Sequence, residues 1–199
     1  MKKLLKISAL IAVMALTCVF FGCSNGNSSD EDNSNSGGST TSSFDDCTTT
    51  ANEVTLADGN WSLKITKSAD GMSSEINIKA TASNGSLTYK SVSETQTVDL
   101  SKMLTDDQLA AFNALSEDNK KQTIIAETEC PEDAIITFNG NIVTIKASLS
   151  TEALADCQSK YNLSSIPSGA IIKTNSDKTK YTITSSDDGK TMVCYISKD

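Results

Sequence analysis

The side chains available for chemistry in this chain are carboxylates, lysines, hydroxyls and thiols. The sequence holds 25 Asp and Glu and no His, and all 17 basic residues are Lys. Because His is the commonest general base and metal ligand, its absence excludes Ser-His and Cys-His nucleophiles and His-containing metal sites. The absence of Arg excludes bidentate binding of phosphate or carboxylate by a guanidinium group.

Adjacent acidic residues occur at Asp106-Asp107, Glu132-Asp133 and Asp187-Asp188. Neighbouring side chains point to opposite faces of a strand, so these pairs do not resemble two glycosidase carboxylates placed across a cleft. The segment Gly189-Lys190-Thr191 lacks the earlier Gly of a phosphate-binding loop. We therefore predict that the chain is not an enzyme and that it uses no metal and no cofactor.

Residues 1–22 have the pattern of a secretory signal peptide. Lys2, Lys3 and Lys6 form a positive start, and an apolar stretch over residues 7–21 follows. This stretch is shorter than the roughly 20 apolar residues that a spanning helix needs, and a polar run follows it directly. The pattern therefore favours export over a permanent membrane helix.

The end of the apolar stretch, Phe20-Phe21-Gly22-Cys23, resembles the lipobox of bacterial lipoproteins, in which a small residue precedes an acylated Cys. Phe20 and Phe21 depart from the motif, because Leu and then a small residue are usual there. The rival lipidation site, Cys18, lies inside the apolar run. The resemblance implies acylation of Cys23, for example with palmitate, and a membrane anchor in the cell envelope. We expect the outer membrane, on its periplasmic or surface-exposed face; an ordinary secreted protein is the alternative.

Residues 23–51 carry the lipidated Cys and a run of Ser, Asn, Gly and Asp in which Phe44 is the only large apolar residue. Such a segment buries too little surface to fold, so we expect a flexible tether. Removal of residues 1–22 leaves 14 Lys against 25 acidic residues, a net charge of −11. So acidic a chain without Arg predicts no nucleic-acid partner.

Four cysteines remain outside the signal peptide and the lipidation site. An even number in an exported chain predicts two disulfides, each worth about 2–4 kcal/mol of stability. Three connectivities are possible, and the spacing does not choose among them. The disulfide candidates are Cys47, Cys130, Cys157 and Cys194.

Residues 52–199 are expected to form one mainly β domain of the α+β class. Five Asn-Gly or Asp-Gly dipeptides mark turns, and the runs between them alternate apolar and polar residues, which indicates an antiparallel meander or a small barrel of about nine strands. The turns are Asp58-Gly59, Asp70-Gly71, Asn84-Gly85, Asn139-Gly140 and Asp188-Gly189. The later expected strands include Gln122–Glu129, Ala134–Phe138, Ile142–Ser148, Ala170–Thr174, Lys180–Ser185 and Thr191–Ser197.

Two segments have helical spacing instead. A capping box at Thr105-Asp106-Asp107-Gln108 opens a helix that runs to about Asn119. A second helix begins at Ser150 or Thr151 and stops before Pro167. We expect both to be short, amphipathic and packed on an open end or face of the sheet.

Gly59-Asn60-Trp61 resembles the Gly-x-Trp motif of lipocalins and related calycins. The resemblance implies an eight-stranded barrel whose closed end is plugged by Trp61. In that family a basic residue, commonly Arg, crosses the Trp from the final strand; here only Lys190 or Lys198 could take that place. A helix inserted between early and late strands is also unlike the usual lipocalin order.

Two functions remain open for the domain. In the first, a barrel interior holds a small apolar molecule, as calycins do. In the second, the same residues form a closed core and the outer surface binds an envelope protein, as in an adhesin, assembly factor or antigen. The expected interior residues are Trp61, Leu63, Ile65, Ile76, Ile78, Leu87, Tyr89, Ile183 and Tyr195.

Overall fold

The computed structural model describes residues 44–128, 130, 133–148, 154, 166, 168–187 and 190–199. It contains nine strands and, within these residues, three helices. The strands are β1 (Thr49–Ala51), β2 (Gly59–Ala69), β3 (Met72–Ser83), β4 (Ser86–Asp99), β5 (Ile135–Asn139), β6 (Ile142–Ser148), β7 (Ile171–Thr174), β8 (Lys180–Asp187) and β9 (Lys190–Lys198). The helices are α3 (Leu100–Met103), α4 (Asp106–Asn113) and α5 (Glu117–Thr128).

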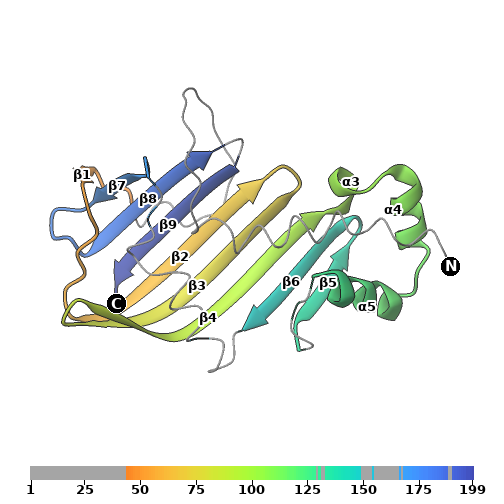
Figure 1. Ribbon diagram of the computed structural model, residues 1–199, viewed down its shortest axis with the longest axis horizontal. Coiled ribbons are helices and arrows are strands. Elements are labelled where there is room, and N and C mark those ends of the chain that lie inside the picture. Colours follow the sequence, from red (N-terminus) through yellow and green to blue (C-terminus); the bar gives the residue numbers. More distant parts are fainter. Residues whose placement is uncertain are drawn as a thin grey trace.

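All nine strands form one sheet in the order β1-β7-β8-β9-β2-β3-β4-β6-β5, and every neighbouring pair is antiparallel. β1 and β5 lie at opposite ends of the sheet (Figure 1). The expected mainly β fold is therefore confirmed, but the described strands form an open sheet and not a closed barrel. The physical reason is that β1 and β5 are edge strands that do not pair with each other.

The turn dipeptides locate three of the hairpins correctly. Asp70-Gly71 joins β2 to β3, Asn84-Gly85 joins β3 to β4, and Asn139-Gly140 leads from β5 into β6. At the second of these turns both residues have positive φ, 50° and 74°, as a type I′ turn requires. Asp58-Gly59 is not a hairpin turn, because Gly59 is the first residue of β2; residues 188–189 lie outside the described part.

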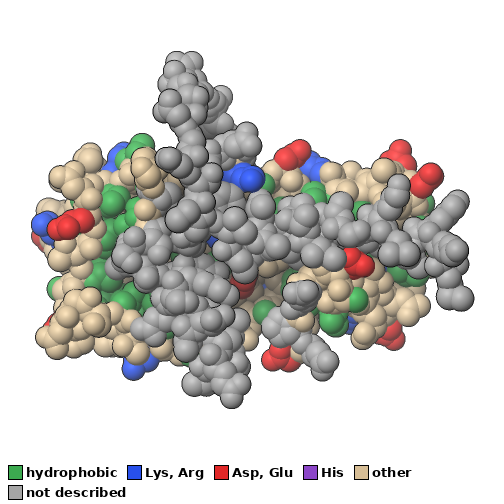
Figure 2. All heavy atoms as spheres, viewed as in Figure 1, with side chains coloured by type: hydrophobic (Ala, Val, Ile, Leu, Met, Phe, Trp, Pro, Cys, Tyr) green, Lys and Arg blue, Asp and Glu red, His purple; other side chains and the backbone are tan. Residues whose placement is uncertain are grey.

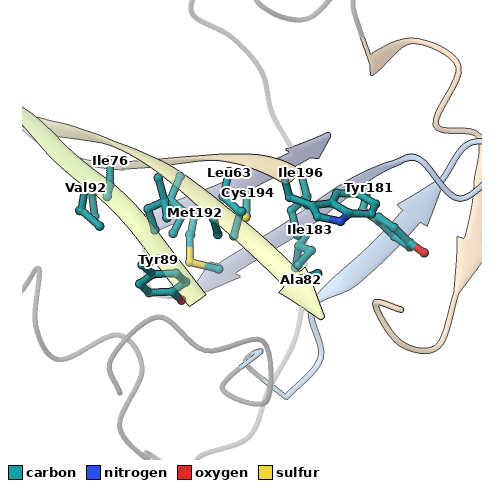
Figure 3. Packing of buried hydrophobic residues seen from close by; sticks show 14 of the residues in the cluster. Leu63, Ile76, Ala82, Tyr89, Val92, Tyr181, Ile183, Met192, Cys194 and Ile196 are labelled. Atoms are coloured by element: carbon teal, nitrogen blue, oxygen red, sulfur yellow. The ribbon is translucent and has the colours of Figure 1, made fainter. Parts of the chain in front are cut away.

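One face of the sheet carries two apolar clusters, and we call it the covered face. The large cluster draws its buried side chains from β2, β3, β4, β7, β8 and β9, and Figure 3 shows how Leu63, Cys194 and Ile183 lie together within it. The small cluster contains Val98, Leu100, Phe112, Ile124, Ile136, Val143 and Ile145. The opposite face, which we call the exposed face, carries mostly Ser, Thr, Lys and Asn side chains.

The three helices lie beside β5 and β6 at one end of the sheet (Figure 1). The predicted capping box is confirmed, because the Thr105 hydroxyl accepts from the Gln108 amide and the Gln108 side chain accepts from the Thr105 amide. The strand expected over Gln122–Glu129 is wrong, since α5 occupies these residues up to Thr128 and buries Ile124 in the small cluster. Of the second expected helix, only Leu154 and Ile166 are described; Leu154 is helical and Ile166 is not.

Residues 44–51, expected to belong to the tether, are part of the folded domain. β1 pairs with β7, and the Phe44 ring packs against Tyr195 with 5.1 Å between ring centroids. Lys180 Nζ lies 3.1 Å from an Asp46 carboxylate oxygen and fixes the same segment. Residues 1–43, with Cys18 and the expected lipidation site Cys23, lie outside the described residues. Within the described part, no helix has the length and apolar character to cross a membrane.

Candidate functional site

Most residues expected to line an interior do come together on the covered face. Tyr195 does not: on β9 it alternates with Cys194 and Ile196, so it projects from the exposed face towards Phe44. That assignment was wrong. The residues in the large cluster, or packed against it, are Trp61, Leu63, Ile65, Ile76, Ile78, Leu87, Tyr89 and Ile183.

The end of the large cluster is closed by residues 54–57, which we call the strap. Val54 and Leu56 pack against the cluster. The fully buried Trp61 donates a 2.8 Å hydrogen bond from Nε1 to the Ala57 carbonyl, and the Tyr181 hydroxyl donates a 2.7 Å bond to the Thr55 carbonyl. Two aromatic side chains of the sheet thus hold the strap in place.

The two lysines considered as replacements for a lipocalin-type basic residue lie at opposite ends of β9. Lys198 is the cross-strand neighbour of Trp61. Lys190 pairs with Asp187 at the far end of the β8–β9 ladder. Only Lys198 therefore occupies the place beside the Trp that the resemblance implies.

A polar strip separates the two clusters on the covered face. Lys67 and Ser74 are direct cross-strand neighbours, exposed at only 8% and 7%, and the Ser74 hydroxyl has no hydrogen-bond partner among the described residues. On β4, Gln96 lies opposite Ser74 and donates a 3.0 Å bond to Glu94. A buried serine hydroxyl of this kind is able to hydrogen-bond to a polar group of a ligand.

The sequence analysis missed this strip, although β2 carries a signal for it. Trp61, Leu63 and Ile65 alternate on the covered face, and Lys67 is next in the same phase. A charged residue in the apolar phase of a strand is unusual, because removing a charge from water is costly unless the charge is paired and hydrogen-bonded.

The cysteines do not form the expected disulfides in the described part of the chain. Cys47, Cys130 and Cys194 are free thiols, and Cys157 lies outside the described residues. The reason is placement: Cys194 belongs to the large cluster, Cys130 packs against the small one, and Cys47 lies near Asn175 and Lys180. Burial raises the pKa of Cys194 to about 12, and burial together with Asp46 raises the pKa of Cys47.

A continuous row of hydroxyl side chains crosses the exposed face, and we call it the hydroxyl row. Strand pairing sets one member of the row opposite the next over seven neighbouring strands. None of these hydroxyls makes a side-chain hydrogen bond in the described part of the chain. The row consists of Ser186, Thr191, Ser68, Ser73, Thr97, Thr144 and Thr137.

The acidic pair that lies wholly within the described residues, Asp106-Asp107, belongs to no cluster of acidic side chains there. Asp106 and Asp107 occupy the exposed first turn of α4, where carboxylates interact favourably with the helix dipole. On the face seen in Figure 2 the acidic side chains are scattered and most lie towards the periphery. Among the described residues, no group of three or more Cys, Asp or Glu is arranged to hold a metal ion.

No known family, no curated protein and no solved structure matches this chain.

Proposed function

We propose that this chain is a lipoprotein of the bacterial cell envelope, anchored through Cys23, whose sheet domain binds another envelope protein. The observation that carries the proposal is the contrast between the two faces. Most of the expected ligand-lining side chains pack against one another in the large cluster, where Trp61 is fully buried. The exposed face instead offers a wide surface of hydroxyls and lysines to a partner.

The lipid anchor is testable separately from the binding domain. Cells that express the wild-type chain are labelled with radioactive palmitate and compared with Cys23→Ala and Cys18→Ala variants. The label is expected in the wild type and in Cys18→Ala and absent from Cys23→Ala. Palmitate labelling that persists in the Cys23→Ala variant would contradict anchoring through Cys23.

The binding role is tested by native mass spectrometry of the chain released gently from membranes. A protein complex without a small-molecule adduct is expected. The double variant Ser73→Lys, Thr97→Lys changes the centre of the exposed face and should abolish the complex, whereas Asp107→Lys, on the exposed first turn of α4, should leave it intact. Equal loss in both variants contradicts recognition through the exposed face.

The second candidate function, binding of a small apolar molecule, is favoured by the polar strip. Such a molecule would need a polar group, because the apolar cluster borders Lys67 and the hydroxyl of Ser74, for which the described residues provide no hydrogen-bond partner. A discrete adduct that is lost on denaturation, and weakened by Ser74→Ala, would support this function over the first. The absence of an adduct in both the wild type and the Ser74→Ala variant would count against small-molecule binding.

A further inference from the structure

The strand β5 forms one edge of the sheet and, among the described strands, pairs only with β6 (Figure 1). Asn139 and Ile142 flank a two-residue turn, so they form a hydrogen-bonded pair. Because the pattern alternates along an antiparallel ladder, Ile136 and Phe138 direct their backbone N–H and C=O groups away from β6. These groups make no hydrogen bond in the described part of the chain.

The residues of this edge lack the side chains that commonly protect a sheet edge. Residues 134–141 contain no charged side chain and no Pro, and Ile135 is 64% exposed. Natural edges are commonly blocked by Lys, by Pro or by shortness. The opposite edge strand, β1, has three residues, whereas β5 has five.

We propose that β5 pairs antiparallel with β5 of a second copy of this chain, around a two-fold axis at Thr137. In this register Ile136 lies opposite Phe138 of the partner subunit. The two-fold axis generates a second, identical pair, in which Phe138 lies opposite Ile136 of the partner subunit. Both pairs use the outward backbone groups, so four hydrogen bonds close the edge. The free edge is therefore complementary to itself, as a two-fold interface requires.

The side chains are compatible with the same register on both faces. Ile136 and Phe138, which belong to or pack against the small cluster, continue that apolar surface across the axis. On the exposed face Thr137 meets its own copy, which joins the two hydroxyl rows end to end. Asp133, the nearest described acid before the strand, comes opposite the neutral Asn141. No like charges therefore face each other.

A covalent trap at the axis tests this register. Thr137 would form a non-hydrogen-bonded pair, whose Cα atoms lie about 4.5 Å apart, within the range that a disulfide spans. The full chain carrying Thr137→Cys, in membranes of the producing cell, is oxidised with copper phenanthroline. Non-reducing gels and peptide mass spectrometry then report which cysteines are linked. Ser73→Cys is the matched control, because Ser73 is exposed in the same hydroxyl row but lies on an interior strand.

We expect a dimer linked through residue 137, at about ten-fold higher yield than any Ser73→Cys dimer, because pairing raises the effective thiol concentration. Thr137→Lys sets two ammonium groups opposite each other and should weaken wild-type self-association about ten-fold in sedimentation velocity, whereas Ser73→Lys should not. Both substituted positions are exposed, so folding, checked by circular dichroism, should be retained.

Equal cross-linking of the two Cys variants overturns the proposal, as does a dimer whose linked peptide joins other cysteines. Attachment of a different protein to the introduced thiol overturns it in favour of strand addition by a foreign partner. The pairing rests on strand geometry alone and stands whether or not the exposed face binds another envelope protein.

Discussion

Trp61 on β2 and Tyr181 on β8 lie with their ring centroids 6.5 Å apart, and each donates a hydrogen bond to the strap. The two bonds reach carbonyls two residues apart, those of Ala57 and Thr55. Because a buried carbonyl without a partner is costly, these aromatic side chains fix the path of the strap as well as filling the core.

Removal of one of these bonds should destabilise the domain measurably. Tyr181→Phe deletes the hydroxyl that binds the Thr55 carbonyl, and we expect the free energy of unfolding to fall by about 1 kcal/mol. Urea denaturation followed by the fluorescence of Trp61, the sole Trp, measures the change. Tyr195→Phe is the control, since that hydroxyl makes no hydrogen bond in the described residues. Equal losses in both variants would contradict the role of the strap.

The capping box at the start of α4 should also contribute to stability. Thr105→Ala removes the hydroxyl that accepts from the Gln108 amide, and a loss of about 1 kcal/mol is typical of such a change. Thr105→Ser keeps the hydroxyl and should retain most of the stability. The free energy of unfolding of the Thr105→Ala and Thr105→Ser variants is measured by urea denaturation, and the stability of the helix by amide hydrogen exchange in residues 106–113. If the Ser variant is as unstable as the Ala variant, the cap is not the cause.

The thiols should differ widely in reactivity. Cys130 is partly exposed, whereas Cys194 is buried and its pKa is raised to about 12. At pH 8 a thiol with that pKa is ionised in roughly one molecule in ten thousand, and the thiolate is the reactive form. Maleimide labelling of the native chain with peptide mapping should modify Cys130 first and Cys194 only after denaturation. Labelling of Cys130 and Cys194 at the same rate in the native chain would contradict the burial of Cys194.

Glu75 should make stability depend on acidity. Lys64 Nζ lies 2.8 Å from one carboxylate oxygen, the Asn77 amide donates a 3.0 Å bond to the other, and these contacts lower the pKa of Glu75 below 4.5. The stabilisation is therefore complete above pH 4.5 and is lost as the pH falls through the lowered pKa.

The matched variant Glu75→Gln should be less stable than the wild type near neutral pH and equal to it in strong acid. The difference should be below about 1 kcal/mol, because the Glu75 side chain is 41% exposed and solvent screens the pair. Urea denaturation across the acid range measures it. A difference that persists after Glu75 is protonated would mean that the carboxylate charge is not responsible.

Local signals in the sequence predicted much of the sheet. Asn84-Gly85 is the clearest case, because only positive φ at both residues closes a two-residue turn between twisted strands. The capping box at Thr105 likewise fixes the start of a helix within four residues. Turns and helix caps of this kind depend on interactions between residues that are close in the sequence, so a single sequence is enough to predict them.

Predictions failed where a residue pattern was consistent with two structures. Residues 122–129 contain a β-branched pair, which favours a strand. In the structure they belong to α5 up to Thr128, and the helix buries Ile124 in the small cluster. On β9 both phases are apolar, since Met192, Cys194 and Ile196 alternate with Val193 and Tyr195. Alternation alone could not decide which set faces the core, and Tyr195 was placed on the wrong face.

The site depends on pairing between distant strands, which no local pattern reports. Lys67 and Ser74 become neighbours through the β2–β3 register, and the strip is completed by Gln96 of β4. The order of the sheet has the same origin, because β9 inserts between β8 and β2.

That insertion determines when the sheet can be completed during synthesis. Thr66 of β2 donates to the carbonyl of Val193, 127 positions further along the chain. Until residues 190–198 have been made, β2 keeps an open edge in what becomes the middle of the sheet. Long-range pairing of this kind forms slowly and leaves nascent chains prone to aggregation. Export in the unfolded state, which the proposed signal peptide implies, would delay folding until β9 is present and so avoid that hazard.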